Sequence, residues 1–216
     1  MSKTFLITGA NRGIGAALSQ SLTDRGDTVL RTARSGEGFL PLDVTETTSH
    51  QALANQLDGQ VIDTLICNSG VYLDKGYSLE TDYDAEAWAQ TYAVNVTGVF
   101  LTVQNLLANL RLSSSPKIAI ISSQMGSSTR ASGTSMIYRT SKAAALNLGF
   151  NLASALKDEG IAVGIYHPGW VRTDMGGDDG DIDVGEAVTG LVKEFDALSL
   201  TSTGCFRTWD GRDHPI

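Results

Sequence analysis

The stretch Lys3–Gly15, KTFLITGANRGIG, places a short apolar run directly before a turn that is rich in glycine. A nearly continuous apolar run is typical of a parallel strand that is buried on both faces. The next segment, Ala16–Arg25, has the apolar spacing of a helix and is followed by Gly26, a residue that favours helix termination. Strand, glycine-rich turn and helix in this order are the context in which such a turn predicts a dinucleotide-binding site rather than a plain connection.

Predicted strands and helices alternate along the rest of the chain. Further strands are expected at residues 27–32, 39–44, 62–67, 117–122, 161–166 and 204–210, and further helices at 45–57, 85–110, 135–159 and 184–198. Thr45 is the expected N-cap of the first of these helices. The alternation predicts an α/β fold with a doubly wound, mainly parallel sheet of seven strands and helices on both faces, as a single domain over residues 1–216.

The link between the second and third predicted strands is unusually short. Only about Ser35–Gly38 separate them, whereas a parallel crossover usually needs about a dozen residues or more. Either a bare loop replaces the helix and leaves one sheet face less covered, or one of the two strands is misassigned.

The composition is that of an ordinary globular protein, with 42% hydrophobic and 19% charged residues. A formal net charge of −8 argues against duplex nucleic acid or an anionic membrane as partner. Cys67 and Cys205 each lie in an apolar run and look like small buried hydrophobes, although two cysteines also permit one disulfide. The N-terminus has no signal-peptide pattern, and no run approaches the roughly 18 apolar residues of a membrane span, so we expect a cytoplasmic protein.

Tyr138 and Lys142 lie four positions apart near the start of a predicted helix, and therefore one turn apart on one face. The pKa of a free phenol is about 10. A nearby ammonium and the positive end of a helix both favour the phenolate, so we expect the pKa of Tyr138 to be lowered. Such a phenol donates a proton to a carbonyl, or accepts one from an alcohol, near neutral pH. The same spacing also arises by chance on solvent-facing helices.

Seven segments, in order, resemble the short-chain dehydrogenase/reductase family over nearly the whole chain. They are Thr8–Gly15, Asp43-Val44, Asn68–Gly70, Asn95–Gly98, Ser122-Ser123, Tyr138–Lys142 and Pro168-Gly169. The detail of Ser122–Gly126, His167–Gly177 and Trp209–Gly211 looks most like the C-factor-like branch, which includes carbonyl reductases and signalling-associated members. The resemblance implies a Rossmann-type fold, a substrate site at the C-terminal ends of the strands, and reversible hydride transfer between a nicotinamide and a carbonyl or secondary alcohol.

The resemblance also implies four catalytic residues. Tyr138 would be the general acid and base, and Lys142 would lower its pKa and bind the nicotinamide ribose. Ser123 would bind the substrate oxygen; we choose it over Ser122 because adjacent side chains of an extended segment face opposite ways, and because Gly126 matches the family spacing from the second serine. Asn95 would help to hold a water of the proton relay, unless it is a plain buried asparagine.

The residues near the predicted phosphate site favour NADP(H) over NAD(H). An acidic residue usually follows the second strand in NAD enzymes, but here Ala33 and Arg34 stand at that position, and Arg12 lies in the glycine-rich turn. Two guanidinium groups without a carboxylate suit a 2′-phosphate. Alternatively, both arginines are merely solvated.

The other predicted cofactor contacts come from the family motifs. Asp43 would contact the adenine, unless it only forms a turn after its strand, and Thr173 would orient the nicotinamide carboxamide. The complete predicted cofactor set is Gly9, Asn11, Arg12, Gly13, Ile14, Gly15, Arg34, Asp43, Val44, Asn68, Ser69, Gly70, Tyr138, Lys142, Pro168, Gly169, Val171 and Thr173. No metal site is predicted.

The substrate pocket is expected between Tyr72, Met125, Trp170 and the loop at 174–183, which would be either a small mobile lid or an open edge. Relatives commonly form dimers or tetramers through the two long helices, so we expect a homo-oligomer, and a small carbonyl or alcohol as substrate. A nucleotide-binding sensor with little turnover is the alternative function.

The three histidines receive no catalytic role. His167 is expected to be structural or part of the pocket wall, and His50 and His214 are expected at the surface without partners.

Overall fold

A computed structural model describes residues 2–216. Its strands are β1 (Thr4–Ile7), β2 (Thr28–Ala33), β3 (Leu40–Pro41), β4 (Thr64–Cys67), β5 (Lys117–Ile121), β6 (Ala162–His167) and β7 (Cys205–Thr208). They form one sheet of seven strands in the order β3-β2-β1-β4-β5-β6-β7, in which every neighbouring pair is parallel. The predicted doubly wound parallel sheet is confirmed. The strand order reverses between β1 and β4, where such folds bind ligands at the carboxyl edge.

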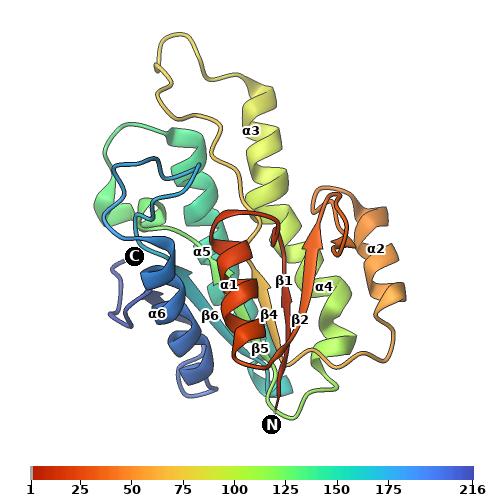
Figure 1. Cartoon of the computed structure of the whole chain (residues 1–216). Helices are drawn as coiled ribbons and strands as arrows, with labels where there is room; N and C mark the ends of the chain where they lie inside the picture. The colour runs from red at the N-terminus through yellow and green to blue at the C-terminus, as the bar shows by residue number, and fades with distance from the viewer. Residues whose placement is uncertain (1) are drawn as a thin grey trace.

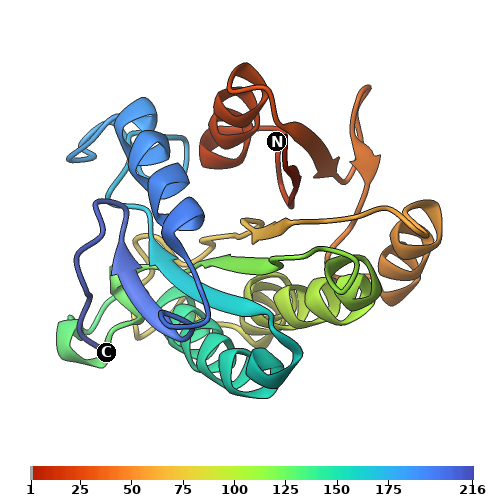
Figure 2. The same ribbon diagram turned by 90° about the horizontal axis from the view of Figure 1, so that it is seen from below.

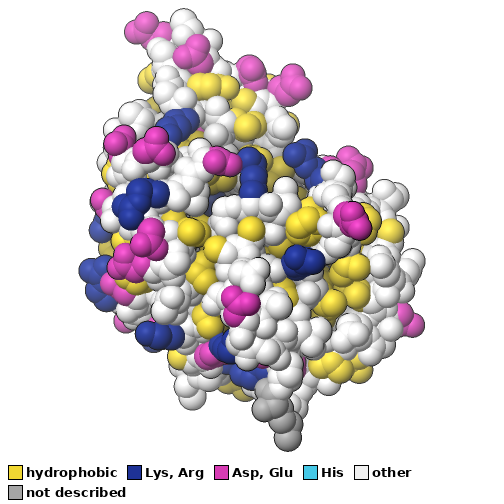
Figure 3. All heavy atoms as spheres, in the orientation of Figure 1, with side chains coloured by type: hydrophobic (Ala, Val, Ile, Leu, Met, Phe, Trp, Pro, Cys, Tyr) yellow, Lys and Arg dark blue, Asp and Glu magenta, His cyan; other side chains and the backbone are white. Residues whose placement is uncertain are grey.

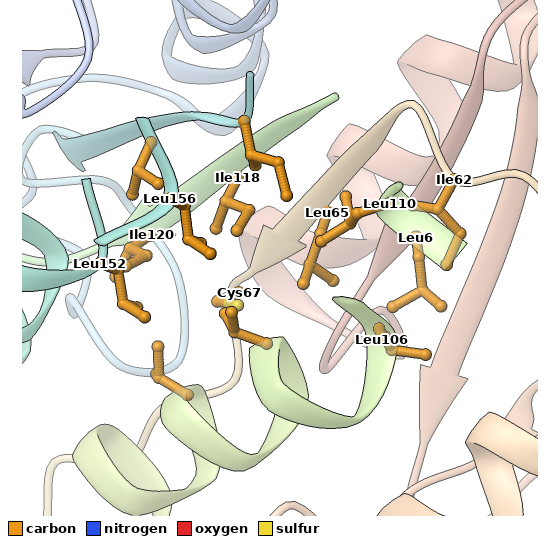
Figure 4. Close-up of a cluster of buried hydrophobic side chains, with 14 of the residues drawn as sticks. Leu6, Ile62, Leu65, Cys67, Leu106, Leu110, Ile118, Ile120, Leu152 and Leu156 are labelled. Atoms are coloured by element: carbon orange, nitrogen blue, oxygen red, sulfur yellow. The ribbon is translucent and has the colours of Figure 1, made fainter. Parts of the chain in front are cut away.

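Helices cover both faces of the sheet, as Figures 1 and 2 show. One face carries α1 (Gly13–Asp24) and α6 (Val184–Ala197), and the other carries α2 (Thr47–Gln56), α4 (Gly98–Leu110) and α5 (Met136–Leu156). Each layer has its own apolar cluster. The cluster under α4 and α5 is drawn in Figure 4 and includes Leu6, Leu65, Leu106, Ile120 and Leu152. Burial of these side chains holds the helix N-termini at fixed places above the carboxyl edge of the sheet.

The long helical run at residues 85–110 is interrupted at its middle. It consists of α3 (Ala85–Tyr92), a π-helical turn (Ala93–Thr97) and α4. By length and composition this run is apolar enough to cross a membrane, contrary to the expectation from the sequence. Its packing is that of a core helix, because Val103, Leu106 and Leu110 are buried against the sheet.

Several element boundaries differ from the predictions. The third strand spans two residues instead of six, and α2 begins at Thr47 with Glu46 as its N-cap. Thr45 therefore does not cap α2. Its N–H and hydroxyl instead donate to Asp43 Oδ1 at 3.0 and 2.7 Å, so the polar groups that suggested a helix start form a turn after β3.

The short link between β2 and β3 is a bare loop. Both strands exist and pair in parallel, with Thr32 opposite Leu40 and Ala33 opposite Pro41. Because parallel crossovers are right-handed, a helix here would lie beside α1. In its place is an open groove of about 450 Å³, lined by residues that include Gln20, Arg31 and Phe39. The predicted less-covered sheet face is confirmed.

Candidate active site

Ser123, Tyr138 and Lys142 come together at the carboxyl edge of β5. The first two turns of α5 carry Tyr138 and Lys142, which are 7% and 5% exposed. The Ser123 hydroxyl lies close enough to Tyr138 to act on the pKa of its phenol, and it accepts from Met125 N at 3.1 Å. The Lys142 Nζ lies 5.6 Å from the Tyr138 ring centroid and donates to the carbonyl oxygen of Ile121 at 3.0 Å. The structure thus assembles the predicted hydroxyl, phenol and ammonium in one buried cluster.

The two adjacent serines face opposite ways, as strand alternation predicts. Ser122 Oγ points under α5 and donates to the Lys142 carbonyl at 3.0 Å, whereas Ser123 lies beside Tyr138. Gly126 explains how α5 approaches so closely, because a Cβ there would lie 2.7 Å from the Lys142 carbonyl carbon. The choice of Ser123 therefore agrees with the geometry.

Asn95 occupies the π-helical turn and is 1% exposed. Its Oδ1 accepts from Val71 N at 2.9 Å, and its Nδ2 donates to Val71 O at 2.9 Å and to Ser141 Oγ at 3.0 Å. A Cβ added at Gly70 would lie 3.4 Å from both Asn95 Oδ1 and Lys142 Nζ, so the amide and the ammonium border the same small space. The Asn95 side chain braces the segment after Gly70 against α5.

The pKa of Tyr138 shifts against the sequence-based expectation. Burial raises it to about 12, the hydrogen bond from Ser123 opposes this rise, and Tyr72 and Asp74 add to it. Burial also lowers the pKa of Lys142 to about 8. The expected lowering at Tyr138 is wrong because removal from water disfavours the phenolate more strongly than the nearby donors favour it. The phenol is accordingly protonated at neutral pH.

The turn before α1 is built to accept an anion. Arg12 is the extended N-cap residue, and within residues 2–216 no side chain caps this helix. The first N–H groups of an uncapped helix favour a phosphate. Gly13 has a φ of 54°, and a Cβ at Gly15 would overlap Gly9 O and the Asn68 side chain. The residues present therefore fit the pyrophosphate of a dinucleotide.

The segment Asn68–Gly70 ties β4 to β1. Asn68 Nδ2 donates to Thr8 O at 3.0 Å and Gly9 O at 3.1 Å. The N–H groups of Asn68 and Ser69 both donate to the Thr8 hydroxyl at 3.0 Å. These bonds hold the glycine-rich turn at the point where the strand order reverses.

Of the residues predicted at the adenosine end, Arg34 follows β2 and Asp43 follows β3, whereas Arg12 is the N-cap residue of α1. Arg12 and Arg34 are exposed, and Arg12 Nη1 lies 3.9 Å from Asp174 Oδ2. Hydrogen bonds from Thr45 lower the pKa of Asp43, and the charge of Arg34 lowers it further. Arg34 and Asp43 are thus neighbours, with Asp43 Oδ1 already engaged in its turn.

The segment after β6 folds over the glycine-rich turn. Gly169 has a φ of 91°, and Val171 pairs with Ile182 in an isolated bridge. Thr173 Cγ2 lies 4.0 Å from the position of a Cβ on Gly13, so Thr173 faces the turn. Pro168 and Ile14 are at least partly buried, and Asn11 is exposed. Val44 is buried and packs against Gly98 at the start of α4.

The loop at 174–183 is held in place by hydrogen bonds. Trp170 Nε1 donates to Gly176 O at 2.9 Å, and Arg172 Nη1 donates to Gly180 O at 2.7 Å. Trp170 is 44% exposed and available to a ligand. The ring of Tyr72 stacks on Tyr138 with centroids 4.2 Å apart.

The histidines and cysteines take no part in this cluster. His50 and His214 are buried, at 1% and 8% exposure, so their expected surface position is wrong. Burial, with the nearby charges of His214 and Arg130, lowers the pKa of His167 to about 3. Cys67 is buried, and both it and the half-buried Cys205 are free. No group of three or more potential metal ligands lies together in the described chain from Ser2 on.

The contacts of two residues with Tyr138 were not predicted from the sequence. Asp74 is fully buried and accepts from Ile137 N at 2.8 Å and Tyr138 N at 3.2 Å. Tyr72 was expected as a pocket wall and instead lies on the Tyr138 ring. No motif spacing marks Asp74, because it meets α5 only through the fold.

A parallel doubly wound sheet with an uncapped glycine-rich turn after β1 defines a dinucleotide-binding Rossmann-type protein. The model of the short chain dehydrogenase family matches residues 3–181. The chain belongs to the short-chain dehydrogenase/reductase family, which is a family of oxidoreductases.

Three proteins that are similar to this chain have different functions in their names. The chain is 33% identical to 1-hydroxy-2-glutathionyl-2-methyl-3-butene dehydrogenase of Rhodococcus sp., covering 96% of this chain and 97% of the relative. It is 32% identical to C-signal of Myxococcus xanthus, covering 76% and 99%. The NADPH-bound carbonyl reductase from chicken fatty liver superposes with a TM-score of 0.90 at 28% identity, covering 100% and 99%.

Proposed function

We propose that this protein is an NADP(H)-dependent reductase of carbonyl compounds, with a secondary alcohol as the product and reversible turnover. The observation that carries the proposal is the buried cluster of Ser123, Tyr138 and Lys142 beside an uncapped helix N-terminus. The NADPH-bound carbonyl reductase of similar fold supports the same chemistry.

The bound nicotinamide supplies or accepts the hydride, and the protein supplies position, charge and a proton. The α1 N-terminus with Gly13 and Gly15 holds the pyrophosphate, and Thr173 and Lys142 hold the nicotinamide end. Arg12 and Arg34 reach into solvent at the adenosine end, where the absence of a carboxylate after Ala33 supports a preference for the 2′-phosphate.

Tyr138 is the proton donor in the reducing direction. A pKa of about 12 keeps its phenol protonated at neutral pH, so the phenol donates its proton as negative charge grows on the substrate oxygen. Ser123 donates a hydrogen bond to the same oxygen. Asn95 borders Lys142 near Gly70; since its side chain is committed to Val71 and Ser141, a relay at this residue runs through its main chain.

The substrate reaches this cluster between Tyr72, Trp170 and Met125. The wall is aromatic and apolar, whereas the loop at 174–183 carries several carboxylates, which favours an uncharged or cationic substrate over an anionic one. We further propose a homodimer or homotetramer built on the two long helical runs.

A second candidate function is a nucleotide-binding signalling protein with little turnover, which the similarity to C-signal favours. The two candidates differ in one measurable property. A panel of aldehydes, ketones and secondary alcohols is assayed with NADPH, NADH and their oxidised forms, by absorbance at 340 nm. Turnover with a higher kcat/KM for NADPH than for NADH supports the reductase. Tight NADPH binding by calorimetry without turnover on any substrate supports the signalling protein, and an equal or higher kcat/KM with NADH overturns the cofactor preference.

A further inference from the structure

We propose that Asp74 is a positioning residue for Tyr138, closing the N-terminus of α5 from a distant loop so that the phenol keeps its place and its proton. The proposal rests on the proposed function insofar as Tyr138 is the proton donor.

The contacts place Asp74 directly under the reactive helix turn. Its carboxylate is fully buried, and it accepts from Ile137 N at 2.8 Å and from Tyr138 N at 3.2 Å, across 63 and 64 residues of sequence. Ser135, which occupies the N-cap position, is in the left-handed conformation with a φ of 52° and makes no cap bond. Its hydroxyl instead bonds the Tyr72 hydroxyl at 2.5 Å. Asp74 therefore accepts hydrogen bonds from the first N–H groups of α5, as an N-cap side chain usually does, but from a distant part of the chain.

Two other helices of the same protein show the ordinary arrangement. Asp84 Oδ1 accepts from Ala87 N at 2.7 Å at the start of α3, and Asp183 Oδ1 accepts from Glu186 N at 2.8 Å at the start of α6. Both caps are local and exposed. A buried carboxylate costs far more to desolvate than an exposed one, so capping alone does not account for Asp74. Its burial beside Tyr138 indicates that Asp74 also positions Tyr138.

The residues around Asp74 act on the same phenol. Val71 is tied through both main-chain groups to Asn95, and the Tyr72 ring stacks on Tyr138 at an interplanar angle of 21°. The segment 71–74 thus fixes the Tyr138 ring from its face and its main chain together. A fixed donor geometry is what proton transfer to a bound carbonyl requires.

The charge of Asp74 acts in the same direction as burial. It adds to the rise in the pKa of Tyr138, as Tyr72 does, while Ser123 opposes it. Other polar groups that face this turn include the Lys142 ammonium, 5.6 Å from the Tyr138 ring centroid, and the Tyr83 hydroxyl, which accepts from Met136 N at 3.3 Å. The Ser141 hydroxyl donates to Tyr138 O at 2.7 Å. A negative charge here keeps the phenol protonated and available as a donor.

The test is the replacement Asp74→Asn, which keeps an acceptor oxygen and removes the charge. We expect the pH at which half of Tyr138 is ionised to fall by about 0.5 to 1 unit, and the alkaline limb of kcat/KM for carbonyl reduction to move by the same amount. Asp84→Asn is the matched control, because it neutralises a cap on α3. It should leave unchanged both the pH of half-ionisation of Tyr138 and the alkaline limb of kcat/KM. Asp74→Glu keeps the negative charge, so Tyr138 should ionise at the same pH as in the wild-type protein.

Ionisation of Tyr138 is read without turnover, from phenolate absorbance at 295 nm as the difference between each protein and its Tyr138→Phe counterpart. A protein that reduces no carbonyl contradicts the proposed function, while a shifted phenolate midpoint in Asp74→Asn still supports the role of Asp74. If Asp74→Asn does not fold, Asp74→Ser gives the same comparison. A wild-type midpoint in whichever neutral variant folds overturns the proposal.

Discussion

The N-terminus of α1 begins after the extended residue Arg12 and, within residues 2–216, carries no side-chain cap. The N-terminus of α5 begins after the left-handed residue Ser135, and its first N–H groups donate to the buried Asp74. Both helices start at the carboxyl edge of the same parallel sheet. An open N-terminus keeps its partial positive charge for an incoming anion, whereas a closed one uses that charge internally to hold a side chain in place.

This difference also fits the surface of the molecule. Acidic and basic side chains are interspersed over the face shown in Figure 3 rather than collected in one field. A net charge of −8 repels anions at long range, so a phosphate must be held by local donors. The open turn at α1 provides such donors, and the arginines beside it extend them.

The largest expected effect comes from removing the group that α5 holds. Tyr138→Phe deletes the phenol hydroxyl and its bond with Ser123, so kcat for carbonyl reduction should fall by about 10²- to 10⁴-fold. The dissociation constant for NADPH, measured by calorimetry, should change little, because α1 holds the pyrophosphate. Tyr92→Phe, a half-buried tyrosine on α3, is the matched control. A Tyr138→Phe variant with near-wild-type kcat would remove Tyr138 from the mechanism.

A second effect concerns the buried ammonium on α5. The pKa of Lys142 is lowered from 10.5 to about 8 by burial, so between these two pH values the unfolded chain binds a proton that the folded chain lacks. The free energy of unfolding should therefore rise with pH across this window, by about 3 kcal/mol from this group. Lys142→Met should abolish that rise, as measured by urea unfolding at pH 7 to 10. Parallel stability curves for the two proteins would contradict the shift.

The sequence predicted those parts of the site whose geometry is local. Gly13 and Gly15 follow a strand and open a helix, Tyr138 and Lys142 share one helical face, and Ser123 alternates with Ser122. Each relation is fixed by the period of its own element, so spacing alone was enough.

The features that were predicted wrongly, or not at all, depend on the tertiary structure. The pKa of Tyr138 rises because packing excludes water, and His50 is buried although its neighbours are polar. Asp74 reaches α5 across 63 residues with no periodic pattern. The third strand is short because β3 pairs with β2 over only two residues before the chain enters the turn at Asp43. Burial and long-range contacts of this kind are properties of the assembled fold.

A third prediction concerns a substitution that would cap the N-terminus of α1. Arg12 has the extended conformation of an N-cap residue, so Arg12→Asp should cap α1 and raise the free energy of unfolding by about 1 kcal/mol relative to Arg12→Ala. The same carboxylate occupies the donors meant for phosphate and repels it, so NADPH should bind about tenfold more weakly than to Arg12→Ala. Calorimetric binding and thermal unfolding of both variants check the two effects. Equal NADPH affinity in the Asp and Ala variants would argue against phosphate binding at this turn.

The smallest expected effect concerns the ion pair of Arg12 and Asp174 beside the uncapped N-terminus of α1. Arg12 Nη1 lies 3.9 Å from Asp174 Oδ2, and both side chains are mostly exposed, at 67% and 87%. An exposed pair of this length contributes little to stability, but while it forms it competes with a 2′-phosphate for the guanidinium. Asp174→Asn should therefore tighten NADPH binding by about two- to threefold at low salt and leave NADH binding unchanged. Asp178→Asn, another exposed carboxylate of the same loop, separates this pairing from the general removal of one negative charge. An equal gain in both variants, or a gain that persists at 1 M salt, would mean that Arg12 is not released by the change.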